Sequence, residues 1–224
     1  MSKKQLTKGP EINVGEAISQ TERFLEENRK ALLISLIAVL AVVAVCFGYH
    51  YLYRKPLKEE AMAQMFVAEQ YFRAEQYELA LYGDGNSLGF LQVIDDYGKA
   101  APKSVYMYAG VSHLQSGNYN EAIPLLKRYS SKDPVLQARA ICNIGDAYAS
   151  LSNNEEALNY YMKAANHTDN LFTAAYLMKA AIVHEQLGNK DKAIQLYESI
   201  KLKYPMSMEG YEADKYISRL QQQQ

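Results

Sequence analysis

Residues 141–157 read ICNIGDAYASLSNNEEA, and two other stretches of the chain share their pattern. Residues 106–122 read YMYAGVSHLQSGNYNEA, and residues 177–193 read LMKAAIVHEQLGNKDKA. Each begins with a large apolar residue, has a small residue four places later and a ring three places after that, and passes through a polar turn to a closing Ala. The closing residues are 35 and 36 places apart. Self-similarity at such a period indicates a stack of structural repeats.

The pattern predicts two helices packed as a hairpin. A small residue on the first helix (Gly110, Gly145 or Ala181) lets the second helix cross closely, and the closing Ala accepts that contact. In two of the turns, a Gly-Asn pair supplies the left-handed conformation that ends the first helix. The bulky residues that fill the remaining space are Leu126, Tyr161 and Tyr197. One hairpin cannot cover its own apolar face, so we expect the hairpins to stack into an α-solenoid.

This pattern resembles the tetratricopeptide repeat, and the resemblance covers about 100 residues. The usual Trp position holds Tyr, Ile or Leu instead, and Asn154 and Lys190 replace a turn aromatic that Tyr119 retains. The resemblance implies an all-α solenoid of about four hairpins.

The repeats extend outward in both directions. An earlier, altered unit contains AEQYFRAEQYELA, which Gly83-Asp84-Gly85-Asn86 interrupts before a helix resumes, so we expect a loop before or within its second helix. We predict a repeat domain over residues 57–224, with units near 60–102, 103–137, 138–173 and 174–206 and a capping helix at 207–220.

An apolar stretch precedes the repeats. Residues 31–49 read ALLISLIAVLAVVAVCFGY, carry no charge and would measure roughly 28 Å as a helix, close to the hydrocarbon thickness of a bilayer. Residues 49, 51 and 53 are tyrosines, which favour the membrane interface. We therefore predict a transmembrane helix at 31–53. The alternatives are a cleaved signal peptide, which the long polar tail and the bulky residues after the stretch disfavour, and a buried helix of a soluble protein.

Residues 1–30 form a polar tail in which we expect disorder at the start and a weakly amphipathic juxtamembrane helix from Val14 onward. Lys and Arg residues close to the span are balanced on its two sides, and the lysines of the tail favour an N-terminus on the cytoplasmic side.

No catalytic or metal-binding motif is present in the sequence. His184-Glu185 begins like a zinc-protease helix but lacks the second His, and His113 and His184 occupy the packed ring position of the repeat. Cys142 has no partner in a CxxC pair and is expected to be buried. The loop at residues 83–86 lacks the carboxylates of a calcium loop. We expect no enzyme activity, no metal, cofactor or small-molecule substrate and, at a net charge of −1, no nucleic acid.

The tetratricopeptide resemblance also implies a partner-binding groove, because the first helices of such repeats line a concave surface. The predicted groove residues are Met107, Val111, Arg139, Asn143, Asp146, Met178, Lys179 and Ile182. Their mixture of apolar and charged side chains suits an extended or helical peptide. The alternative is a solvated solenoid face with binding elsewhere. The set of Lys, Asn and Arg residues with which one subclass grips a C-terminal carboxylate is incomplete here.

The complete layout is similar to the ancillary subunit of the bacterial Sec translocon: a charged helix (SQTERFLEENRK), one span and degenerate repeats with GFLQVIDDYG, IGDAY and YESIKLKYP segments. The resemblance implies a single-pass protein of the bacterial inner (cytoplasmic) membrane with a cytoplasmic N-terminus and periplasmic repeats. It also implies translocon and chaperone partners for a non-enzymatic scaffold. The alternatives are an adaptor in envelope assembly or cell-wall regulation, and a scaffold that faces the cytoplasm.

Overall fold

The computed structural model describes residues 14–222. The chain divides into two compact units, Met1–Pro56 and Leu57–Gln224. Every regular element in the described part of the chain is a helix, and no β-strand occurs there. The predicted all-α class is confirmed. The disorder expected at the start of the tail concerns residues that lie outside the described range.

The first unit is built on one long helix. Helix α1 (Val14–Gly48) continues into a π-helix, η1 (Tyr49–Arg54). The described residues contain one helix that is long and apolar enough to cross a membrane, and none of its most apolar 18-residue window is buried within the protein. Aromatic rings stack along its end, with centroids 4.4 Å apart for Phe47 and Tyr51 and 5.5 Å apart for Tyr49 and Tyr53. This unit therefore exposes an apolar surface that no other part of the unit covers.

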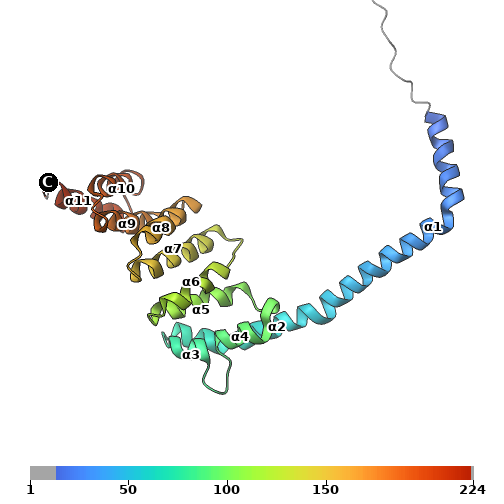
Figure 1. Cartoon of the computed structure of the whole chain (residues 1–224), viewed down its shortest axis with the longest axis horizontal. Helices are drawn as coiled ribbons and strands as arrows, with labels where there is room; N and C mark the ends of the chain where they lie inside the picture. The colour runs from blue at the N-terminus through green and yellow to red at the C-terminus, as the bar shows by residue number, and fades with distance from the viewer. Residues whose placement is uncertain (1–13, 223–224) are drawn as a thin grey trace, which may run out of the picture. The chain divides into compact units, whose positions relative to one another are not determined.

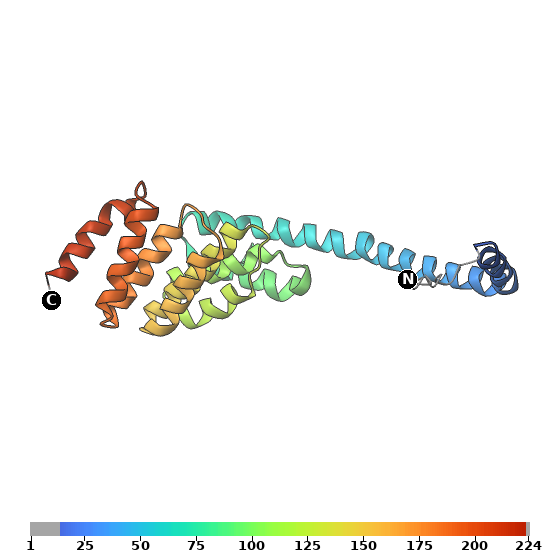
Figure 2. The ribbon, with the colours of Figure 1, turned by 90° about the horizontal axis from the view of Figure 1, so that it is seen from above.

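The second unit is a stack of helical hairpins that follow one another in chain order (Figures 1 and 2). Its elements are α2 (Lys55–Arg73), α3 (Tyr77–Tyr82), α4 (Phe90–Tyr97), the 3₁₀-helix η2 (Gly98–Ala100), α5 (Lys103–Gln115), α6 (Tyr119–Arg128), α7 (Pro134–Ser150), α8 (Asn154–His167), α9 (Thr173–Gln186), α10 (Lys190–Lys203) and α11 (Met208–Gln221). Each predicted hairpin is thus a pair of consecutive helices, such as α7 and α8. The predicted solenoid is confirmed.

Four hairpins share one turn geometry. In each, a residue with positive φ precedes the second helix, and these residues are Glu75, Gly117, Ser152 and Gly188. The next residue donates its backbone N–H to the carbonyl of the ring residue five places earlier, as Asn118 does to His113 and Asn153 does to Tyr148, at 2.8 and 2.9 Å. Such bonds satisfy carbonyl groups that the end of a helix would otherwise leave unpaired. The shared turn identifies the altered first unit as a true repeat.

The close helix crossings occur at the predicted small residues. A Cβ atom added to Gly110 would lie 2.7 Å from Cγ of Leu126, and one added to Gly145 would lie 2.7 Å from the ring of Tyr161. The closing alanines of the three stretches are fully buried, and they are Ala122, Ala157 and Ala193. At Gly110 and Gly145 the first helix therefore approaches the second at a distance that only the absence of a side chain permits.

The loop in the first repeat interrupts its second helix. After α3, Asp84 accepts hydrogen bonds from the backbone N–H groups of Asn86 and Ser87 at 2.9 and 2.7 Å and from the hydroxyl of Tyr71 at 2.8 Å. The bond from Tyr71, followed by those from the backbone, lowers the pKa of Asp84. The loop is therefore an ordered turn fastened to α2, and α4 resumes the helix after it.

Helix α11 packs against the last hairpin. Ala213, Ile217 and Leu220 are buried in one cluster with residues of α9 and α10. Such a terminal helix covers apolar surface that the last repeat would otherwise expose to water.

Candidate partner-binding groove

The predicted groove residues lie on α5, α7 and α9, the first helices of three consecutive hairpins. Met107 and Val111 on α5 are half-buried and pack against a cluster that includes Ile144 of α7. On α7, Arg139 is exposed and Asn143 is half-buried. These positions leave part of each side chain available to a partner.

Met178 differs from the expectation. Its side chain is only 7% exposed and lies in the core cluster with Ala181, Tyr197 and Ile217. The equivalent position one repeat earlier is Cys142, which is buried as well. In these two repeats the residue at this position faces the neighbouring helices instead of solvent, so Met178 contributes to packing. The neighbouring groove residues on α9, Lys179 and Ile182, remain accessible.

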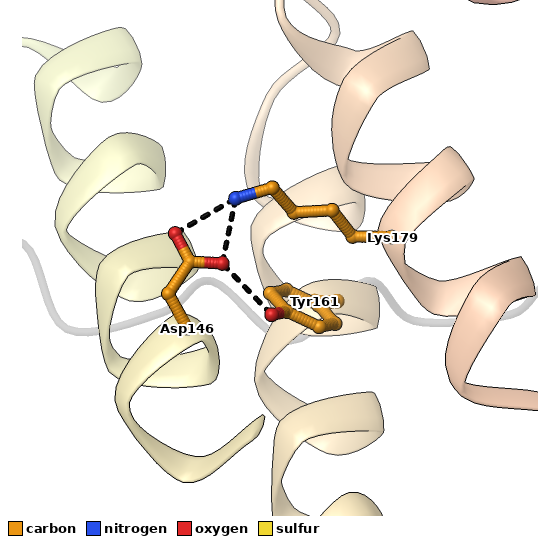
Figure 3. Close-up of polar contacts among 3 residues, drawn as sticks. All are labelled: Asp146, Tyr161 and Lys179. Carbon is orange, nitrogen blue, oxygen red and sulfur yellow. Dashed lines mark hydrogen bonds and ion pairs between the residues drawn. The ribbon is translucent and has the colours of Figure 1, made fainter. Parts of the chain in front are cut away.

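Asp146 is the centre of a polar cluster that joins three helices (Figure 3). The ammonium of Lys179 on α9 donates to both carboxylate oxygens of Asp146 on α7, at 2.6 and 2.7 Å. The hydroxyl of Tyr161 on α8 donates to Oδ1 of the same carboxylate at 2.8 Å. The Lys179 ammonium also lies 5.6 Å from the centre of the Tyr161 ring. Asp146 and Lys179, both predicted for the groove, are thus brought together.

The electrostatics of this cluster keep its members in defined protonation states. Burial, and after it the negative charge of Asp146, raise the pKa of Tyr161, so its hydroxyl stays a donor. Burial alone would lower the pKa of Lys179, but the carboxylate of Asp146 favours the charged ammonium and the pKa is raised. Burial raises the pKa of the Cys142 thiol to about 12, so it stays protonated at neutral pH. Cys142 therefore behaves as a packing residue without nucleophilic character.

Arg139 presents the exposed cation of the groove. Its guanidinium lies 5.1 Å from the centre of the Phe172 ring, which restricts the side chain without neutralising its charge. The hydroxyl of Tyr176 is buried and has no hydrogen-bond partner among the described residues. Because Asp146 already holds Lys179, Arg139 is the groove cation most available to an acidic group on a partner.

The next repeat carries a similar polar cluster that sequence reasoning missed. Tyr197 donates to Glu185 at 2.5 Å, and Arg219 of α11 donates to the other oxygen of that carboxylate at 2.5 Å. Tyr161 and Tyr197 are equivalent positions, and both were predicted as packing residues only. Each tyrosine lies four places after the closing Ala of its repeat, and this spacing is the sequence signal that they share. The acids do not occupy equivalent positions, because Glu185 lies about one helical turn further along its helix than Asp146 does in the preceding repeat.

The arrangement contains no catalytic constellation among the described residues. In residues 14–222 no group of three or more His, Cys, Asp or Glu side chains could hold a metal ion. The groove offers hydrogen bonds, an exposed guanidinium and apolar contacts, which are the means of binding a polypeptide.

Parts of the chain are similar to a known repeat family and to solved structures. Two tetratricopeptide-repeat family models match residues 138–166 and 175–207. A crystal structure of nearly identical TPR-like repeats from a Podosopora anserina putative kinesin light chain is 15% identical and covers 74% of this chain and 86% of that chain, with a TM-score of 0.56. The crystal structure of MamA is 21% identical over 70% of this chain and 93% of that chain, with a TM-score of 0.49. No curated protein matches by sequence.

Residues 138–166 and 175–207 thus match the tetratricopeptide repeat, and the repeat unit has the helical solenoid fold of solved TPR-like repeats. Repeats of this kind generally mediate protein–protein interaction.

Proposed function

We propose that this protein is a membrane-anchored scaffold that binds other polypeptides through the groove on α5, α7 and α9. The observation that carries the proposal is the joining of a repeat solenoid to a helix whose apolar surface is wholly exposed. A helix of this length satisfies its own backbone hydrogen bonds in lipid, whereas in water its apolar side chains would stay uncovered. Residues 31–53 are the membrane anchor in this proposal.

The chemistry of the groove favours a peptide with alternating apolar and acidic character. Val111 and Ile182 offer apolar contacts, and the guanidinium of Arg139 can pair with a carboxylate. An extended or helical segment presents side chains at the spacing that such a groove requires. The anchor would keep partners close to the membrane, so that weak contacts still produce high occupancy.

The similarity of the layout to the ancillary subunit of the bacterial Sec translocon supports a more specific placement. We place the N-terminus in the cytoplasm, the span in the inner membrane and the repeats in the periplasm, with translocon components and periplasmic chaperones as partners. An adaptor in envelope assembly or cell-wall regulation is the second candidate, and a repeat domain in the cytoplasm is the third.

Protease treatment of intact spheroplasts tests the orientation. Digestion of the repeat unit from outside supports the periplasmic placement. If the repeat unit is protected until the cells are lysed, the repeats face the cytoplasm and the proposed partners are wrong. A cytoplasmic marker protein that stays intact shows that the spheroplasts are sealed.

Site-specific photo-cross-linking tests the groove. A photoreactive amino acid at Ile182 of the full chain should capture partner proteins, whereas the same group at Asn159, an exposed residue of α8, should not. Mass spectrometry then identifies the captured chains. Equal capture from both positions contradicts binding in the groove. Capture from Ile182 that never includes translocon or chaperone components contradicts the translocon placement while retaining the scaffold.

A further inference from the structure

The turn between α10 and α11 carries an apolar surface that the groove does not include. Four large side chains within ten residues are exposed to unusual extents: Leu202 by 81%, Met206 by 82%, Met208 by 74% and Tyr211 by 69%. We name these four residues the C-terminal edge. A contiguous apolar surface on a folded domain commonly marks an interaction site, whereas single exposed apolar residues do not, and these four residues lie close together in the sequence at one end of the repeat unit.

The C-terminal edge is held in place by an ordered turn. Ser207 caps α11 by accepting the backbone N–H of Gly210 at 3.0 Å, and its hydroxyl donates to the carbonyl of Tyr204 at 3.0 Å. The backbone of Gly210 approaches Tyr204 so closely that a Cβ there would lie 2.1 Å from that carbonyl oxygen. The hydroxyl of Tyr211 lies 3.8 Å from Sδ of Met206, which brings these two side chains together. The backbone that joins α10 to α11 is therefore ordered, and it holds Met206 and Tyr211 against each other.

We propose that the C-terminal edge is a two-fold symmetric interface with a second copy of this chain. The four residues expose roughly 600 Å² per copy, so a symmetric pair that covered them completely would bury about 1,200 Å², the lower bound for specific interfaces of standard size. In a two-fold interface the same patch contacts itself, so a single patch is enough for a closed pair. This inference goes beyond the proposed function and does not depend on any partner of the groove.

The charges around the C-terminal edge favour a second copy over a lipid surface. Lys201 is already paired with Asp214 at 2.6 Å. The remaining nearby charges are two cations, Lys203 and Lys215, and three acids, Glu198, Glu209 and Glu212. This rim is not basic, so it offers no attraction to anionic headgroups. It carries both signs, so in a symmetric pair a lysine of each copy can face an acid of the other.

Measurement of the oligomeric state tests the proposal. The full chain is purified in detergent with Cys46→Ser, because Cys46 is an exposed thiol that could link copies by itself. Sedimentation equilibrium should show a monomer–dimer equilibrium. Met206→Glu combined with Met208→Glu should weaken dimerisation by about tenfold or more, because the new like charges would face each other across the axis.

Leu171→Glu provides the matched control, because Leu171 is equally exposed, at 78%, but lies outside the C-terminal edge. It should leave the equilibrium unchanged. Circular dichroism melts confirm that all variants fold. A parent chain that stays monomeric up to about 100 μM overturns the proposal, since specific homodimers form well below that concentration. A dimer that the double variant does not weaken also overturns it and assigns dimerisation to another surface, such as α1.

Discussion

At the scale of single residues, Gly145 shows how a missing side chain sets the distance between two helices. Gly145→Ala would place a methyl group 2.7 Å from the Tyr161 ring, and that ring is held by its bond to Asp146. Overpacking of this kind costs about 1–3 kcal/mol, against a gain of up to about 1 kcal/mol in helix propensity. We expect the free energy of unfolding to fall by about 1–2 kcal/mol. Urea denaturation measures it.

Ser150→Ala is the control for this prediction, because Ser150 is exposed on the same helix and gains only helix propensity. It should leave stability unchanged or slightly raised. If Gly145→Ala also stabilises the protein, the ring of Tyr161 can move and the close crossing does not determine the helix spacing.

Protonation of His113 should make the stability of the fold depend on pH. This residue is buried on α5, and burial lowers its pKa below the ordinary value of 6.5, although Glu121 and Glu78 partly oppose the shift. The folded protein thus favours neutral His113, while the unfolded chain binds a proton near pH 6.5. Its stabilising contribution is therefore complete above about pH 6.5 and is lost as the pH falls towards the lower folded pKa.

His113→Gln should flatten this loss of stability between about pH 7 and pH 5, as measured by thermal melts across that range. His167→Gln, at an exposed residue at the end of α8, should leave the profile as it is. A profile that His113→Gln does not alter would assign the pH dependence to other groups.

At the scale of elements, the hairpin turns show which helix ends could be predicted. The Gly-Asn pairs indicated left-handed residues at Gly117 and Gly188, and these have φ of 79° and 75°. Glu75 and Ser152 adopt the same conformation at φ of 57° and 59° without a glycine. A β-carbon in this region costs about 1 kcal/mol, so these two turns hold strain that the rest of the hairpin outweighs.

Ser152→Gly should therefore raise the free energy of unfolding by about 0.5 kcal/mol, since the relief of strain exceeds the added flexibility of the unfolded chain. The same change two residues earlier, Ser150→Gly, lies within α7 and should lower stability, because glycine disfavours the helix. Thermal melts of the two variants measure both changes in melting temperature. A lower melting temperature for Ser152→Gly would show that the turn is not strained.

The Asp146 cluster acts on three helices at once. Lys179 and Asp146 are partly exposed, at 41% and 25% of their side chains, so solvent screens their attraction. In a double-mutant cycle with Lys179→Met and Asp146→Asn, we expect a coupling energy of about 1 kcal/mol. A coupling energy indistinguishable from zero would mean that the ion pair orients side chains at the groove surface but does not stabilise the packing of α7 against α9.

At the scale of the whole repeat unit, the sequence predicted what is local and missed what depends on the packing of one repeat on the next. The helices, the close crossings and two of the turns follow from residues within one hairpin. The pair of Asp146 and Lys179 joins residues 33 places apart, and the rotation of α9 against α7 decides whether they meet. The burial of Met178 has the same origin, because neighbouring helices cover the position that repeat register assigned to the groove.

This dependence on neighbours leads to a prediction about how the solenoid loosens. Each repeat contacts only the repeats beside it, so a defect at one end should not spread through the stack. Ile217→Ala with Leu220→Ala removes buried side chains of α11 from their cluster with α9 and α10, at a cost of about 2–5 kcal/mol for each. Hydrogen exchange followed by mass spectrometry should become faster in α9, α10 and α11 and stay unchanged in α5 and α6. Faster exchange in all the helices would show that the hairpins unfold as one cooperative block. In that case a partner bound in the groove would stabilise the complete stack and not only the repeats that it contacts.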